Sequence, residues 1–141
     1  MNQKLNIYQK IKNVQAKLSD GITKSHENKF QRYFYFNEHD TLNILKPLLA
    51  EQNLTLLISD VKDIPLESAK QEKEWTVRYQ KQALIINADN PQEQILEYFW
   101  SCGQNTDLAK AKGSADTYAV KYFLQKFFLI PLNDNDDPDK K

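Results

Sequence analysis

The sequence contains few of the residues that form covalent cross-links or hold metals and phosphates. Its single cysteine, Cys102, excludes a disulfide or a cysteine zinc cluster within one chain and favours a reducing, cytoplasmic compartment. No apolar run approaches the ~20 residues needed to cross a bilayer, and no signal peptide is expected. A Gly-x-x-x-x-Gly-Lys phosphate-binding loop is also missing, so ATP use is not predicted.

The chain has no excess charge of either sign, because 19 Lys and Arg residues balance 19 Asp and Glu residues. The charges are unevenly placed: cations dominate residues 1–36, and acids gather in residues 134–139. A polyanion binds a local patch of cations, so a nucleic-acid partner is compatible with this neutral total. The 141 residues fit one domain, and we expect a core domain over 1–132 and a solvated acidic tail over 133–141.

The apolar spacing predicts an α+β fold. Apolar residues recurring every three or four positions indicate helices, and alternating apolar and polar residues indicate strands. The expected elements are a helix over 4–18, an aromatic strand over 30–36, a helix after Asn37, strands over 54–60, 75–88 and 94–102, and a final helix from about Lys112. The polar run 63–73 is expected to be a mobile loop or hairpin tip. This order predicts a curved antiparallel sheet with its helices on one side.

The final helix combines small, cationic and aromatic residues. Gly113 and Ala115 are small enough to let another backbone approach closely. Tyr118 and Tyr122, four residues apart, are expected to pack in the core. On the preceding strand, Cys102 is interpreted as a buried small hydrophobic residue. A polar stripe at helical spacing consists of Lys110, Ser114, Thr117, Lys121 and Gln125.

This helix also carries a pattern of residues that points to a family. The pattern consists of Lys110-Ala111, Gly113, Ala115, Thr117-Tyr118-Ala119 and Lys121-Tyr122, followed by the apolar run 123–131. It resembles the core of the Erf family of phage single-strand annealing proteins. The likeness extends upstream to residues 30–35 and 45–49 and covers nearly the whole chain. The loop before the helix, with Asp107 and residues 108–112, has fewer glycines and acids than the family pattern.

The resemblance implies a Rad-type β-β-β-α core whose subunits assemble into a homo-oligomeric ring or helical filament. It also implies an ATP-independent protein of phage homologous recombination that binds and anneals single-stranded DNA in the cytoplasm of a bacterial host. A single-strand-binding protein or a phage exonuclease is a further partner suggested by the family. We expect no enzymatic activity, no cofactor, no bound metal and no membrane partner.

The candidate DNA-binding residues are cations, which contact phosphates, and aromatic rings, on which bases stack. They are Lys24, Lys29, Arg32, Tyr33, Tyr35, Arg78, Lys81, Lys110, Lys112 and Lys121. Lys121 is favoured among the helix lysines because it occupies the basic position of the family pattern. The alternative interpretation is that the rings belong to the core and the charges to a solvated face, with Lys112 pairing with Asp116 one turn on.

Two other function classes stay open. One is a module that binds or protects single-stranded DNA or RNA without annealing it. The other, less favoured, is a metal-dependent nuclease using carboxylates such as Asp60, Asp63 and Asp107, although these are scattered in the sequence. The acids of the tail lack the central Gly and terminal Glu of a calcium loop, so a solvated tail is favoured over a metal site.

Overall fold

The structure, a computed structural model, describes residues 4–18, 27–28, 33–34 and 38–131. In chain order its elements are α1 (Ile7–Lys17), β1 (Glu27–Asn28), β2 (Tyr33–Phe34), α2 (Glu38–Glu51), β3 (Leu54–Asp60), β4 (Glu67–Gln71), β5 (Glu74–Asn87), β6 (Gln94–Asn105) and α3 (Leu108–Phe127). Strands β1 and β2 pair with each other, and the other four described strands form one antiparallel sheet. The predicted α+β class is confirmed.

The long strand β5 organises the sheet. Its first half pairs with β4 and its second half with β3, while β6 runs along its other side over nearly its whole length. Every one of these pairings is antiparallel. Strand β6 therefore has one edge against β5 and a second edge that no described strand occupies.

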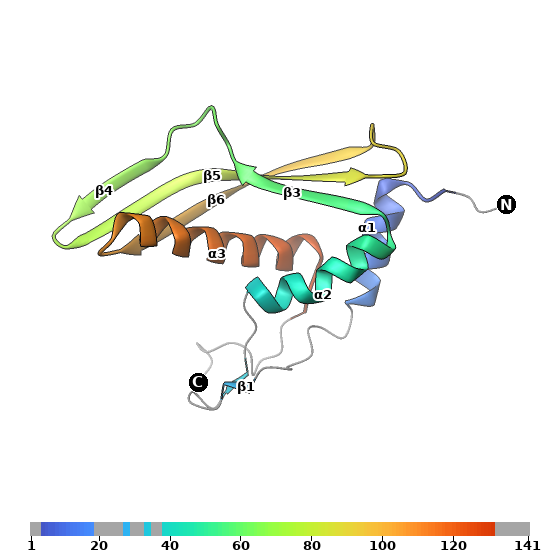
Figure 1. The fold of residues 1–141 in the computed structure, drawn as a ribbon, viewed down its shortest axis with the longest axis horizontal. Helices are drawn as coiled ribbons and strands as arrows, with labels where there is room; N and C mark the ends of the chain where they lie inside the picture. Colours follow the sequence, from blue (N-terminus) through green and yellow to red (C-terminus); the bar gives the residue numbers. More distant parts are fainter. Residues whose placement is uncertain (1–3, 19–26, 29–32, 35–37, 132–141) are drawn as a thin grey trace.

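The described helices lie on one side of this sheet (Figure 1), and the residues of β5 alternate accordingly. Val77, Tyr79, Ala83 and Ile85 are buried beneath the helices, whereas Thr76 and the residues at the other alternate positions are partly or fully exposed. Neighbouring residues of a strand point to opposite faces, so one face forms the core and the other stays open. We call these the covered face and the open face.

The main core lies where α1, α2 and the C-terminal half of α3 meet β3 and β5. Val14, Leu18, Leu45, Leu124 and Phe128 have no exposed surface there. The apolar stripe of the predicted helix over 4–18 supplies the first two, which confirms that prediction. Each such side chain stabilises the fold by about 1.5–3 kcal/mol relative to an exposed position.

A second, smaller cluster holds the N-terminal half of α3 against β5 and β6. Ala111 and Ala115 are fully buried in it. Gly103 on β6 permits this contact, because a Cβ atom at that position would lie 2.5 Å from the carbonyl oxygen of Ala111. Within the described chain, the predicted close backbone approach occurs at Ala115 but not at Gly113, where an added Cβ would meet no atom within 4 Å. An approach of a second copy to Gly113 stays a prediction.

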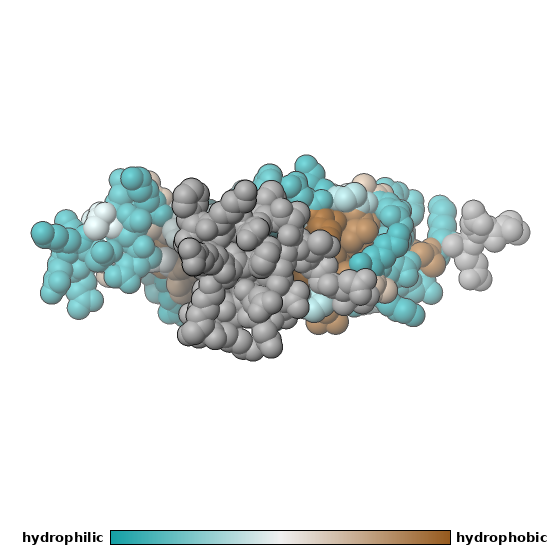
Figure 2. All heavy atoms as spheres, turned by 90° about the horizontal axis from the view of Figure 1, so that it is seen from below, coloured by the Kyte–Doolittle hydropathy of each residue, from teal (hydrophilic) through white to brown (hydrophobic). Residues whose placement is uncertain are grey.

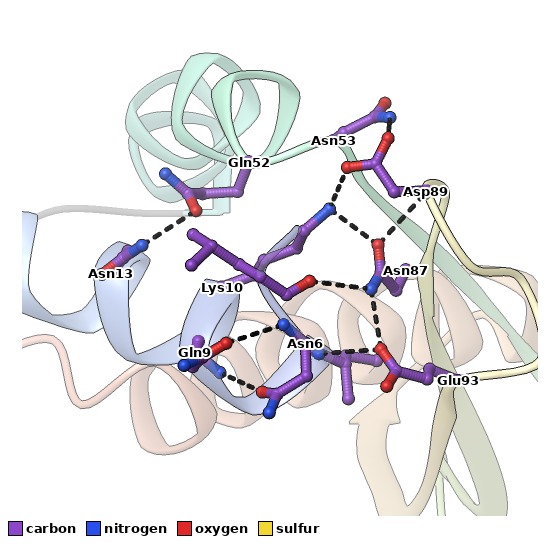
Figure 3. Close-up of polar contacts among 11 residues, drawn as sticks. Asn6, Gln9, Lys10, Asn13, Gln52, Asn53, Asn87, Asp89 and Glu93 are labelled. Atoms are coloured by element: carbon purple, nitrogen blue, oxygen red, sulfur yellow. Dashed lines mark hydrogen bonds and ion pairs between the residues drawn. The ribbon is translucent and has the colours of Figure 1, made fainter. Parts of the chain in front are cut away.

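Polar contacts fix α1 to the turn between β5 and β6 (Figure 3). The Nζ of Lys10, a residue only 3% exposed, donates to Asn87 Oδ1 at 2.7 Å and to Asp89 Oδ2 at 2.6 Å. Glu93 accepts hydrogen bonds from the Asn87 side chain at 2.7 Å and from the backbone N–H of Ile7 at 3.0 Å. The N-terminal helix is thereby joined to a turn far along the chain.

The polar run 63–73 differs from its prediction as a loop, because it contains the strand β4. The expectation matches residues 63–66, which form no strand, and the hairpin tip at Glu72 and Lys73. Every residue of β4 is exposed, so its sequence lacks the apolar alternation by which strands are recognised. Seen from the helix side, this end of the molecule carries mainly hydrophilic residues (Figure 2, left).

Two further boundaries differ from the predictions. Strand β6 continues past residue 102 to Asn105. Helix α3 begins at Leu108, ahead of Lys112, because the Asp107 side chain caps it by accepting a hydrogen bond from the N–H of Lys110 at 3.1 Å. The aromatic strand predicted over 30–36 is described only at β2, and the tail 133–141 lies outside the described residues. No helix within the described ranges is long and apolar enough to cross a membrane.

Candidate nucleic-acid interface

Two of the predicted DNA-binding lysines lie on the covered side of the sheet. Lys81 is only 6% exposed, because it shares the covered face of β5 with Tyr79. Its Nζ lies 2.7 Å from Asp60 Oδ1 on β3 and 3.1 Å from Asp116 Oδ1 on α3. The Nζ of Lys112 bridges the same two carboxylates, at 2.9 Å from Asp60 Oδ2 and 3.4 Å from Asp116 Oδ2. The alternative pairing of Lys112 with Asp116 is thus confirmed.

We call Asp60, Tyr79, Lys81, Lys112 and Asp116 the inner ion cluster. Burial disfavours ionisation of Asp60, but hydrogen bonds from Lys81 and Lys112 outweigh it and hold the pKa of Asp60 below its usual value. The hydrogen bond to Asp60 raises the pKa of Lys112. Burial, together with the hydrogen bond that Tyr79 donates to Asp116, raises the pKa of Tyr79. Both lysines have internal carboxylate partners, which they would have to leave to reach a phosphate.

Arg78 lies on the open face of β5 beside the exposed Trp100 ring of β6, and the exposed Tyr98 ring lies further along the same face. Its guanidinium carbon lies 4.4 Å from the centre of the Trp100 ring, which is a cation–π distance. The Trp100 and Tyr98 side chains are 49% and 53% exposed. A cation and two rings are therefore combined on a surface that the described helices leave uncovered.

Helix α3 presents a second pair of rings, Tyr118 and Tyr122. Their ring centroids lie 6.4 Å apart with the planes inclined by 16°, and both side chains are more than half exposed. The prediction that they pack in the core is wrong. The core takes other positions of α3, such as Val120 and Leu124, and the two tyrosines fall outside that face.

A groove of about 500 Å³ separates this part of α3 from β6. Its lining residues are Phe99, Trp100, Cys102, Tyr118, Ala119, Tyr122, Phe123 and Lys126. The rings of Phe99 and Phe123 stack with centroids 4.4 Å apart and hold the helix against the strand. The prediction that Cys102 is buried is wrong, because strand alternation puts Ser101 on the covered face and leaves the Cys102 thiol exposed.

The groove and the open face meet at the edge of β6 that no described strand occupies, which we call the unpaired edge. We call the exposed cations and rings on both sides of this edge the β6 rim: Arg78, Tyr98, Trp100, Tyr118, Tyr122 and Lys126. Of these, only Arg78 is a candidate from the sequence. The available signal was the alternation of β6: Ser101 and Gly103 lie on the covered face, where Gly103 meets α3, so Tyr98 and Trp100 at the other alternate positions face outward.

The other predicted site residues lie apart from this rim or outside the described ranges. Lys110 is exposed in the first turn of α3. Lys121 is partly exposed with its Nζ 5.2 Å from the centre of the Tyr122 ring, and burial lowers its pKa. The residues Lys24, Lys29, Arg32 and Tyr35 lie outside the described residues, and Tyr33 is described only as part of the backbone of β2. Their role in binding stays a prediction.

Two of the three carboxylates considered for a nuclease have other partners in the fold. Asp60 is engaged by two lysines, and Asp107 caps α3. Within residues 4–18, 27–28, 33–34 and 38–131, no group of three or more His, Cys, Asp or Glu side chains is placed to hold a metal ion.

The fold and the rim together define a class: a small α+β domain with a half-covered antiparallel sheet and an exposed edge bearing cations and aromatic rings. In a comparison with family models, the model described as the ERF superfamily matches residues 7–141. The chain belongs to the ERF superfamily, which confirms the resemblance and associates the chain with phage recombination. A comparison with curated proteins found no match.

Proposed function

We propose that this protein binds single-stranded DNA and anneals complementary strands without ATP during phage homologous recombination. The observation that carries the proposal is the β6 rim, where Arg78 stacks on Trp100 and the rings of Tyr118 and Tyr122 stack on each other across the unpaired edge of β6. Membership in the ERF superfamily supports the same function.

The rim supplies the two kinds of contact that single-strand binding requires. Guanidinium and ammonium groups neutralise phosphates and release their counterions, and each ring on which a base stacks contributes about 1–3 kcal/mol. A duplex keeps its bases stacked inside, so it offers only the phosphates. The combination of Arg78 and Lys126 with four exposed rings therefore favours a single strand over a duplex.

Annealing on such a surface is passive. The cations reduce the repulsion between two polyanions, and the pairing of complementary bases supplies the driving force. We propose that the protein acts as a homo-oligomeric ring or filament, since a second copy is one way to cover a long unpaired strand edge such as that of β6. Mass measurement with and without single-stranded DNA tests the assembly.

The single cysteine allows a direct test of the binding surface. Cys102 lines the groove of the rim and is the only thiol of the chain, so its rate of reaction with a thiol reagent reports occupancy of the groove. An unstructured oligonucleotide should slow this reaction at concentrations that saturate binding. A duplex of the same length and charge is the control and should protect the thiol less. Equal protection by both, or none by either, would count against the rim as the binding surface.

Annealing itself requires a separate measurement, because binding and protection without annealing is the alternative function. Fluorescently labelled complementary oligonucleotides should pair faster with the protein than without it, in the absence of ATP and magnesium. Binding without acceleration would assign the protein to the alternative class.

A further inference from the structure

Three residues from three neighbouring strands form a stack on the open face of the sheet. Glu67 of β4 lies directly opposite Arg78 of β5 in the strand ladder, and its Oε2 is 3.7 Å from the Nη1 of Arg78. The Arg78 guanidinium carbon lies 4.4 Å from the ring centre of Trp100 on β6. All three side chains are substantially exposed.

This arrangement already fills the positions that a nucleic acid would need. A guanidinium at cation–π distance occupies one face of the indole, which is the face on which a base would stack. The carboxylate of Glu67 occupies a side of the guanidinium that a phosphate would contact. The free protein thus satisfies its own ring and its own cation internally.

We propose that Glu67 and Arg78 form a displaceable cover on Trp100, and this proposal rests on the proposed function. When a single strand binds, a base replaces the guanidinium on the ring, and a phosphate replaces Glu67 on the guanidinium. The cation exchanges one anion for another, and the ring exchanges one flat partner for another. Glu67 competes with phosphate for the guanidinium of Arg78 and thereby lowers the affinity for single-stranded DNA.

Complete displacement of the cover requires a ligand that offers a base and a phosphate at the same time. Inorganic phosphate can displace Glu67 but leaves the ring covered, and a duplex offers phosphates while its bases stay stacked. Only an unstacked strand completes both exchanges. The cover therefore adds to the preference of the rim for single strands.

The test compares two variants that remove the same charge. Glu67→Gln releases Arg78, whereas Glu97→Gln removes an exposed carboxylate of β6 that lies roughly 17 Å along the strand from the position opposite Arg78. Both are made in a Trp75→Phe background, so that Trp100 is the only tryptophan and its fluorescence reports binding of an oligonucleotide. We expect Glu67→Gln to bind about twofold to fivefold more tightly than Glu97→Gln, as an exposed ion pair allows.

Two further measurements test whether this gain in affinity comes from release of Arg78. It should disappear when Arg78→Ala is added, and it should shrink as added salt screens the Glu67–Arg78 pair. Equal affinities of the two glutamine variants, or a gain that persists in the absence of Arg78, would overturn the cover while leaving single-strand binding intact.

The cover can also be tested without DNA, which separates its failure from failure of the proposed function. In the Trp75→Phe background, Arg78→Ala should increase quenching of Trp100 by acrylamide, because the ring loses its guanidinium cover. If the parent protein binds no oligonucleotide, the proposed function fails, whatever the quenching result. Unchanged quenching would overturn the cover, whatever the binding result.

Discussion

The two faces of β5 place cations in opposite environments. On the covered face, Lys81 is buried between Asp60 and Asp116, and on the open face, three positions earlier, Arg78 lies over an exposed ring. The inner ion cluster holds β3, β5 and α3 together, while in the β6 rim Arg78 is exposed to solvent and contacts only exposed partners, Glu67 and Trp100, among the described residues. Cations close together in a sequence can therefore serve the fold or a ligand, and strand alternation decides which.

The largest expected effect is the loss of stability on removing a cation from the inner ion cluster, which tests whether that cluster serves the fold. Lys81→Ala leaves two carboxylates with Lys112 as their remaining cation in the cluster, and we expect a loss of about 2–3 kcal/mol in the free energy of unfolding. The figure is below that for a fully buried pair because both acids are more than a third exposed. Urea denaturation measures it, with Lys110→Ala as the exposed control. Reduced single-strand affinity of the folded variant, with stability unchanged, would reverse the assignment.

The next effect addresses the rim. Trp100→Ala removes a half-exposed ring, so the free energy of unfolding should change little, whereas single-strand binding should weaken by about 1–3 kcal/mol for each base that stacks on it. Fluorescence anisotropy of a labelled oligonucleotide measures the affinity. The buried Leu124→Ala is the converse control, because it should lower stability and leave the affinity of the folded protein unchanged.

A smaller effect is expected for Tyr118→Ala. The ring is more than half exposed and stacks on the equally exposed Tyr122, so its loss should cost about 1 kcal/mol of stability or less, far below the cost of truncating a core ring. Removal of the ring should also lower the affinity for single-stranded DNA. Thermal unfolding measures the effect on stability, and an annealing assay measures the effect on function. A large drop in melting temperature would indicate that Tyr118 packs in the core.

The smallest effect is a change in acid stability. The pKa of Asp60 is lowered in the folded protein, so its contribution is present above its ordinary value near 3.8 and is lost as the pH falls through the lower folded value. Asp60→Asn should therefore flatten the acid side of the stability curve. Glu38 acts with the opposite sign, because burial and Asp116 raise its pKa and its protonation favours the folded state. Denaturation midpoints from about pH 2 to 7 would show both. An acid limb in Asp60→Asn parallel to that of the parent protein would contradict the role of Asp60.

Much of the fold was predictable because strong periodic patterns specify it. The helix around Ile7 to Leu18, the strand β3 and the alternation of β5 all have core residues at regular spacing. Strand β4 has none, because every residue in it is exposed, and its only support is pairing with β5. Backbone pairing does not require particular side chains, so a polar strand cannot be distinguished from a loop by its sequence.

The candidate site was less predictable, because exposure depends on where the sheet ends. The alternation that put Tyr79 inside also put Lys81 inside, and applying it would have separated Lys81 from Arg78. For Tyr118, Tyr122 and Cys102, large or apolar character suggested burial, but no described strand lies beyond β6 to cover them. The basic and aromatic candidates around Arg32 lie outside the described residues.

The attachment of α1 through Lys10 has a consequence for the order in which the protein is made. Its partner Asn87 lies 77 residues downstream, so at about 5–20 residues per second the ribosome needs roughly 4–15 seconds to deliver it after Lys10 has been added. During that interval the ammonium group of Lys10 lacks its partners Asn87 and Asp89, and the turn on which α1 docks does not yet exist. In the complete chain the same separation makes this a long-range contact, and we expect it to form after the folding transition state, so that Lys10→Met speeds unfolding and leaves the refolding rate nearly unchanged in stopped-flow measurements.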